Sequence, residues 1–132
     1  MSLKTKSIKK PRMTDDGLCI SIMSRHTLND GVTPDEEITK ESFDEWWPEL
    51  APPLSLIGAY YKQGLPWKDF EREFRNYLQL PQAQARLQSL VALAQSSTVT
   101  ILCIESTPEH CHRRLVAEMC HDMDALLEIL IE

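Results

Sequence analysis

The sequence has no apolar run long enough to span a bilayer, and no apolar segment follows its first lysines. A membrane helix needs about 20 apolar residues, and a secretory signal needs a basic segment followed by an apolar one. These absences argue against membrane insertion and secretion. The four cysteines, without a secretory signal, are typical of reduced thiols in the cytosol. We therefore expect a cytoplasmic protein with no membrane partner.

Glycine is also scarce, with four residues in a chain of 132. Phosphate-binding loops depend on clustered glycines, which let backbone amides approach the phosphate closely. The four glycines here are dispersed, so the sequence excludes a glycine-rich nucleotide loop. We expect no cofactor.

Charge is distributed unevenly in a chain whose net charge is −6. Residues 1–14 contain five basic and no acidic residues, and all 20 acidic residues follow them. An acidic body repels nucleic-acid phosphates, so nucleic-acid binding would have to come from the arm or a local patch and is not favoured. The arm has too little apolar surface to offset the entropy of ordering. We expect residues 1–14 to be a disordered basic arm and residues 15–132 to form a single α/β domain.

Short apolar segments predict three strands, and amphipathic segments predict the helices. The strands are expected at 17–23, 98–105 and 126–132, and the helices at 42–48, 52–64, 66–78, 81–94 and 107–120. The apolar run at 98–105 does not alternate with polar residues, which is typical of a strand covered on both faces. The pattern predicts an α/β fold with a small parallel, Rossmann-like sheet of about three strands. We expect helices on both faces and a helical insertion between the first two strands.

The most informative segment is "ESTPEHCHRR" at 105–114, where a strand is followed by a helix. Thr107 is expected to cap this helix and Pro108 to begin it, which places Cys111 in the first turn. Anions are favoured there, and the pKa of a thiol is lowered. A step of 100° per residue turns His112 toward the sheet, Cys111 to the edge of that face, and Arg113 to the far side with His110 and Arg114.

The spacing of this segment excludes several known sites. A phosphatase loop needs arginine six residues after the cysteine, where this chain has Ala117, and a rhodanese loop needs it five residues after, at Val116. Cys111 and Cys120 are about 13 Å apart along a helix, too far to share one zinc ion. Cys103 and His26 join Cys111 and His112 only if the fold gathers them, so we expect no metal site.

A set of polar residues follows the two predicted strands. The candidate catalytic residues are Glu105, Cys111 and His112, and the candidate ligand-binding residues are Arg25, His26 and Arg113. Adjacent parallel strands end at the same edge of a sheet, where such groups perform acid-base or thiol chemistry on a small anionic ligand. Two alternative functions stay open. One is a nucleotide or nucleic-acid binding module, and the other is an interaction domain in which the same groups only stabilise the fold.

The segment "TILCIESTPEHCHRRLVAE", together with "SFDEWWPELAPP" and "YYKQGLPWKDFEREFRNYL", resembles the domain of unknown function 488 family from about residue 17 to 118. The resemblance implies an α/β fold and a motif carried by Glu105, Cys111, His112 and Arg113. It also implies that Arg25 corresponds to a family arginine after the first strand. It does not imply a particular activity.

Overall fold

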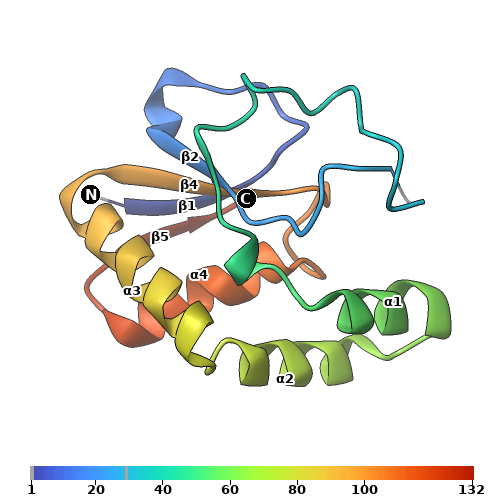
Figure 1. Cartoon of the computed structure of the whole chain (residues 1–132). Coiled ribbons are helices and arrows are strands. Elements are labelled where there is room, and N and C mark those ends of the chain that lie inside the picture. The colour runs from blue at the N-terminus through green and yellow to red at the C-terminus, as the bar shows by residue number, and fades with distance from the viewer. Residues whose placement is uncertain (1, 29) are drawn as a thin grey trace.

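A five-stranded parallel sheet forms the centre of the computed structural model, which describes residues 2–28 and 30–132 (Figure 1). Its order is β3-β2-β4-β1-β5, and every neighbouring pair is parallel. The strands are β1 (Ser2–Ser7), β2 (Leu18–Ser21), β3 (Glu45–Trp46), β4 (Thr98–Cys103) and β5 (Glu128–Ile131). The predicted parallel α/β fold is confirmed, including the C-terminal strand, with five strands in place of about three.

Residues 2–7, expected to be part of a disordered arm, instead form an inner strand of the sheet. β1 lies between β4 and β5 and is buried along its whole length. Leu3 and Thr5 are fully buried, and Leu3 belongs to the main apolar core. Lys4 and Lys6 alternate with them, so they point to the opposite face of the sheet. Both lysines can be buried there because their ammonium groups pair with the buried carboxylate of Asp16.

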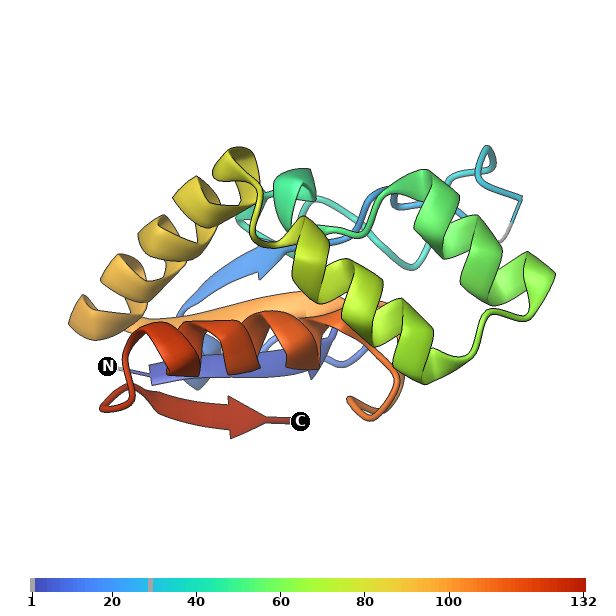
Figure 2. The same ribbon diagram turned by 90° about the horizontal axis from the view of Figure 1, so that it is seen from below.

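All four α-helices lie on one face of the sheet, below it in Figure 1 and in front of it in Figure 2. They are α1 (Leu54–Gln63), α2 (Trp67–Tyr77), α3 (Pro81–Ser96) and α4 (His112–Met123). α1 to α3 form the predicted helical insertion, and Gly64 ends α1 in the left-handed conformation with φ 72°. None of the helices in the described ranges combines the length and apolarity that a membrane span requires.

The expectation of helices on both faces is wrong, and strand order explains why. Right-handed connections that run in opposite directions along a sheet cover opposite faces. The links from β1 to β2 and from β2 to β3 run one way, and those through the α-helices run the other. In the described residues, the first two links contain the 3-10 helix η1 (Thr14–Asp16), an isolated bridge between Thr27 and Pro34, and irregular loops.

The helix expected at 42–48 is replaced by β3 and the 3-10 helix η2 (Pro48–Leu50). The backbone N–H of Trp47 donates to the Ser21 carbonyl, and the Asp44 carboxylate accepts the N–H of Cys19 at 2.9 Å. The Ser42 hydroxyl accepts the N–H of Thr39 and caps no helix. Pairing with β2 therefore outweighs the local capping signal.

A buried ion cluster holds η1 against the face that lacks α-helices. The Asp16 carboxylate, 2 % exposed, accepts hydrogen bonds from Lys6 Nζ at 2.7 Å and Lys4 Nζ at 3.1 Å. It also accepts the Met13 N–H, while Thr100 Oγ1 donates to the Asp16 carbonyl. Burial opposes ionisation, but the hydrogen bonds from Lys6, Met13 and Lys4 outweigh it and hold the pKa of Asp16 below its usual range.

We expect Asp16→Asn to lower the free energy of unfolding by roughly 3–5 kcal/mol at pH 7, because two buried ammonium groups lose their counter-charge. Since folding lowers the Asp16 pKa, this stabilisation is complete above the unfolded carboxyl pKa of about 4 and is lost as pH falls through the folded value. Urea unfolding between pH 7 and pH 3 measures it. Asp15→Asn is the matched control, because the Asp15 side chain is 82 % exposed. Equal losses in the two variants would contradict the assignment.

Candidate functional site

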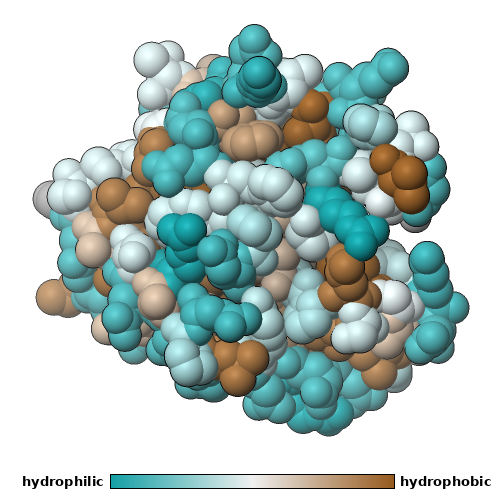
Figure 3. Space-filling model, viewed as in Figure 1, coloured by the Kyte–Doolittle hydropathy of each residue, from teal (hydrophilic) through white to brown (hydrophobic). Residues whose placement is uncertain are grey.

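A cleft of about 790 Å³ opens at the carboxyl-terminal edge of the sheet. One wall is formed by residues 23–28 and 30–31 of the loop after β2, the opposite wall is α1 with the start of α2, and the floor is the end of β4 with the turn that follows. In the space-filling view the surface is hollowed between that loop and α1 (Figure 3). Its position agrees with the rule that ligands of parallel sheets bind where the strands end.

The turn after β4 places Cys111 at the start of α4. The helix was expected to begin at Pro108 but begins at His112, with Cys111 as its extended N-cap residue at φ −132° and ψ 139°. The guanidinium of Arg114 donates to the Pro108 and Glu109 carbonyls, which satisfies backbone acceptors of the non-helical turn. The Cys111 sulfur therefore lies at the positive end of the helix.

His112 points toward the sheet, as predicted, and joins two sulfur atoms. Its Nε2 donates to the Ile22 carbonyl at 2.7 Å, and its Nδ1 lies 3.4 Å from Cys103 Sγ. Because a carbonyl can only accept, Nε2 carries a hydrogen, and Nδ1 is the ring nitrogen that faces the sulfur atoms. The ring also meets Phe74 edge-on, with centroids 5.6 Å apart. His112 Nδ1, Cys103 Sγ and Cys111 Sγ all lie within 4.8 Å of one another, and we call them the sulfur-imidazole cluster.

Arg113, expected on the far side of the helix, is fully buried. Its guanidinium donates to the carbonyls of Glu105 at 2.7 Å and Glu132 at 3.1 and 3.2 Å, and to Cys111 Sγ at 3.2 Å. Within the described ranges no carboxylate side chain pairs with Arg113. The long side chain, at the first turn, reaches back beneath the turn and past the end of β5. Cys111 is the residue whose ionisable side chain contacts this buried cation in the described ranges.

The two sulfur atoms have opposite titration behaviour. Burial raises the pKa of Cys111, but hydrogen bonds from Cys103 and His112 and the charge of Arg113 outweigh burial and hold that pKa well below its usual range. Burial and the neighbouring Cys111 raise the pKa of Cys103 far above its usual value. The arrangement favours a thiolate on Cys111 and a thiol on Cys103.

Glu105 lies at the mouth of the cleft and is held by a residue that the sequence did not suggest. The hydroxyl of Tyr61, on α1, donates to its carboxylate. Burial, followed by this hydrogen bond, raises the pKa of Tyr61. The contact joins residues 44 positions apart in the sequence, so no local spacing could indicate it.

The two candidate residues that follow β2 take different positions. Arg25 lines the cleft, and its guanidinium donates to the Gly31 carbonyl at 3.0 Å. His26 is not among the lining residues. Its Nε2 lies 2.7 Å from the Ser21 hydroxyl, its ring stacks on Phe43 at 4.8 Å, and burial lowers its pKa. The structure therefore brings Arg25, but not His26, together with the other candidates.

Aromatic rings form much of the wall on the α1 and α2 side. Trp67 stacks on His110 with centroids 4.8 Å apart, and Tyr60 packs against Trp67 and Phe70. All four border the cleft. The amphipathic pattern predicted the helix that carries Trp67 and Phe70, but the position of these rings over the cleft depends on the packing of α1 on α2.

One family model matches the chain. It is DUF488-N3a, described as the active DUF488-N3 subclade, and it matches residues 3–124. The chain belongs to the DUF488 family. The resemblance seen in the sequence is thereby confirmed, and the match extends from β1 through α4. No curated protein and no solved structure gives a significant match.

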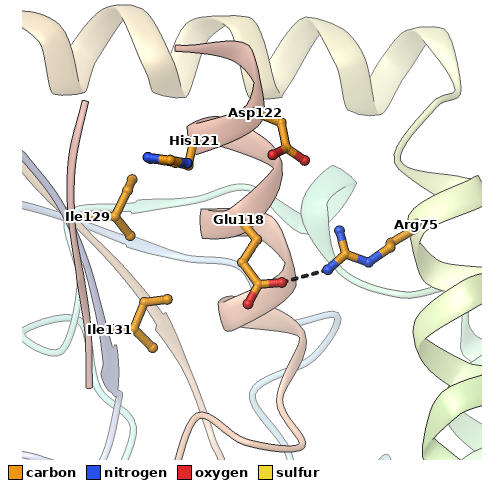
Figure 4. A pocket seen from close by; sticks show the side chains of 6 residues that line it. All are labelled: Arg75, Glu118, His121, Asp122, Ile129 and Ile131. Atoms are coloured by element: carbon orange, nitrogen blue, oxygen red, sulfur yellow. Dashed lines mark hydrogen bonds and ion pairs between the residues drawn. The ribbon is translucent and has the colours of Figure 1, made fainter. Parts of the chain in front are cut away.

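A second depression in this DUF488 domain, of about 440 Å³, lies between α4 and β5 (Figure 4). Its lining is Arg75, Glu118, His121, Asp122, Ile129 and Ile131. Arg75 and Glu118 form an ion pair at 2.6 Å across it, and isoleucines of β5 form one side. It contains no thiol, and the family motif lies at the other, larger cleft.

We expect Arg113→Met to lower the free energy of unfolding by at least about 2 kcal/mol, because it removes a buried guanidinium and leaves the part-buried carbonyls of Glu105 and Glu132 without this donor. Arg114→Met is the matched neighbour. Its ion pairs with Glu118 and Glu71 are partly exposed, so we expect a loss of about 1 kcal/mol or less. Denaturant unfolding at pH 7 compares them. Similar losses would show that Arg113 is not the central support of the turn.

Proposed function

We propose that this DUF488 domain binds a small anionic ligand in the cleft and acts on it through the thiol of Cys111. The observation that carries the proposal is the position of Cys111, a residue that borders the cleft with 2 % of its surface exposed and whose sulfur contacts the buried Arg113 guanidinium at 3.2 Å. A thiol beside a cation and a helix N-terminus is the usual setting of a cysteine nucleophile. Cys103 also borders the cleft, whereas the other two buried cysteines, Cys19 and Cys120, do not.

The remaining groups have distinct roles in this proposal. Cys111 attacks an electrophilic carbon, so that a sulfur–carbon bond forms as the bond to the leaving group breaks. Glu105, at the mouth, exchanges the proton that the leaving group or an incoming water requires. Arg25 and Lys62 line the same cleft and attract the negative charge of the ligand.

We also propose a reducing, cytoplasmic environment, because all four cysteines are buried free thiols. The nucleic-acid alternative lost support when residues 2–7 of the basic arm proved to be a strand, with Lys4 and Lys6 paired to Asp16. The interaction-domain alternative gives no reason for a cleft to surround Cys111.

Two alkylating reagents of similar size test the proposal without a known substrate. Iodoacetate is an anion and iodoacetamide is neutral, so the ratio of their rates at one pH reports local charge and cancels the thiolate fraction. We expect this ratio at Cys111 to exceed that of free glutathione by about 10-fold, because cationic side chains concentrate anions in a cleft. Mass spectrometry of peptides after timed quenching assigns the modified cysteine.

The variants Arg25→Gln and Lys62→Gln should lower the rate ratio toward that of glutathione. Lys68→Gln should leave it unchanged, because Lys68 is exposed on α2 and does not line the cleft. A ratio at or below the glutathione value, or a Cys111 that reacts no faster than Cys120, would refute the proposal.

A further inference from the structure

We infer that the sulfur-imidazole cluster is a Cys2His site for a soft divalent metal ion such as Zn²⁺, with a fourth coordination position facing the cleft. The inference goes beyond the proposed function and does not depend on it. Thiolate and imidazole are the ligands that zinc prefers, and three protein ligands with one open position are typical of zinc ions that act on a substrate.

The distances between the ligand atoms suit one ion. With zinc bonds of about 2.3 Å to sulfur and 2.0 Å to nitrogen, tetrahedral ligands lie about 3.5–3.8 Å apart. Cys103 Sγ and His112 Nδ1 are 3.4 Å apart, and all three atoms lie within 4.8 Å of one another. The ion therefore requires only small side-chain shifts.

The orientation of His112 is a second, independent observation. Histidines that bind metals usually donate their other ring N–H to a carbonyl or carboxylate, which fixes the tautomer. His112 Nε2 donates to the Ile22 carbonyl at 2.7 Å, so Nδ1, the atom that would bind the metal, faces the sulfur atoms. Ile22 directly follows β2, so the backbone of the sheet itself sets this orientation.

The charges and the surroundings also suit the site. Two thiolates and a neutral imidazole balance the charge of one divalent ion, and the N–H of Arg113 that reaches Cys111 Sγ would remain as a hydrogen bond to a bound thiolate. Cys103, Cys111 and His112 all border the cleft, so a small ligand or water could complete the coordination. An ion in this position would occupy the Cys111 sulfur and prevent its attack on a carbon.

Zinc titration of the reduced full-length protein against a chromophoric chelator tests the site. We expect one Zn²⁺ per chain, and Co²⁺ in its place should give a thiolate-to-metal charge-transfer band. Loss of an orienting contact alone weakens metal binding by 10–100-fold, so Cys103→Ala, Cys111→Ala and His112→Gln should each weaken it by about 100-fold or more. Cys120→Ala is the matched control, because Cys120 is buried in the core away from the cluster.

Near-UV circular dichroism shows which variants fold. If Cys111→Ala does not fold, the zinc affinities of Cys103→Ala and His112→Gln still test the site. As a second readout, saturating Zn²⁺ should slow the reaction of Cys111 with iodoacetamide at least about 10-fold in the wild type. Absence of binding, equal affinity in the Cys103→Ala and control proteins, or an unchanged reaction rate would overturn the inference. Zinc binding with no preference for iodoacetate would leave the metal site standing and refute the anionic-ligand proposal.

Discussion

The buried guanidinium of Arg113 connects the fold of this DUF488 domain to its candidate site. It bonds the carbonyl of Glu105 after β4, the carbonyl of Glu132 beside β5 and the sulfur of Cys111 at the start of α4. A buried cation is costly unless polar or anionic partners surround it. The same guanidinium therefore fixes the ends of β4 and β5 and the position of the Cys111 sulfur.

The sheet divides the molecule into two unequal faces. The α-helices and the main apolar core cover one face, and the short η1 with the Asp16 ion cluster covers part of the other. An apolar side chain in place of Lys4 or Lys6 would need another layer of core above it, which a three-residue 3-10 helix does not provide. The ion cluster thus allows a short 3-10 helix and its loop to cover β1 on this face. On the other face, α1 and α2 form a wall of the cleft.

The sequence predicted features that depend on local periodicity, and it failed where a distant partner decides the outcome. Helix α2 was predicted from its aromatic stripe, and His112 from its place on the helix. The prediction of a disordered arm failed for residues 2–7 because Lys4 and Lys6 both pair with the carboxylate of Asp16, ten or more residues away. Arg113 was placed outward because a step of 100° per residue turns its Cα away from the sheet, whereas in the first turn of the helix its long side chain reaches back under the turn.

Cys103 shows most clearly what spacing cannot indicate. In the sequence it is one more apolar residue of β4, eight positions before Cys111. The turn after β4 folds back, so the end of that strand and the start of α4 meet, and the Ile22 carbonyl turns the imidazole between them. Three segments thus fix the orientation of one histidine. Nδ1 faces the sulfur atoms, where it can hydrogen-bond a cysteine or bind a metal, and the occupant of the cluster decides which chemistry the cleft can perform.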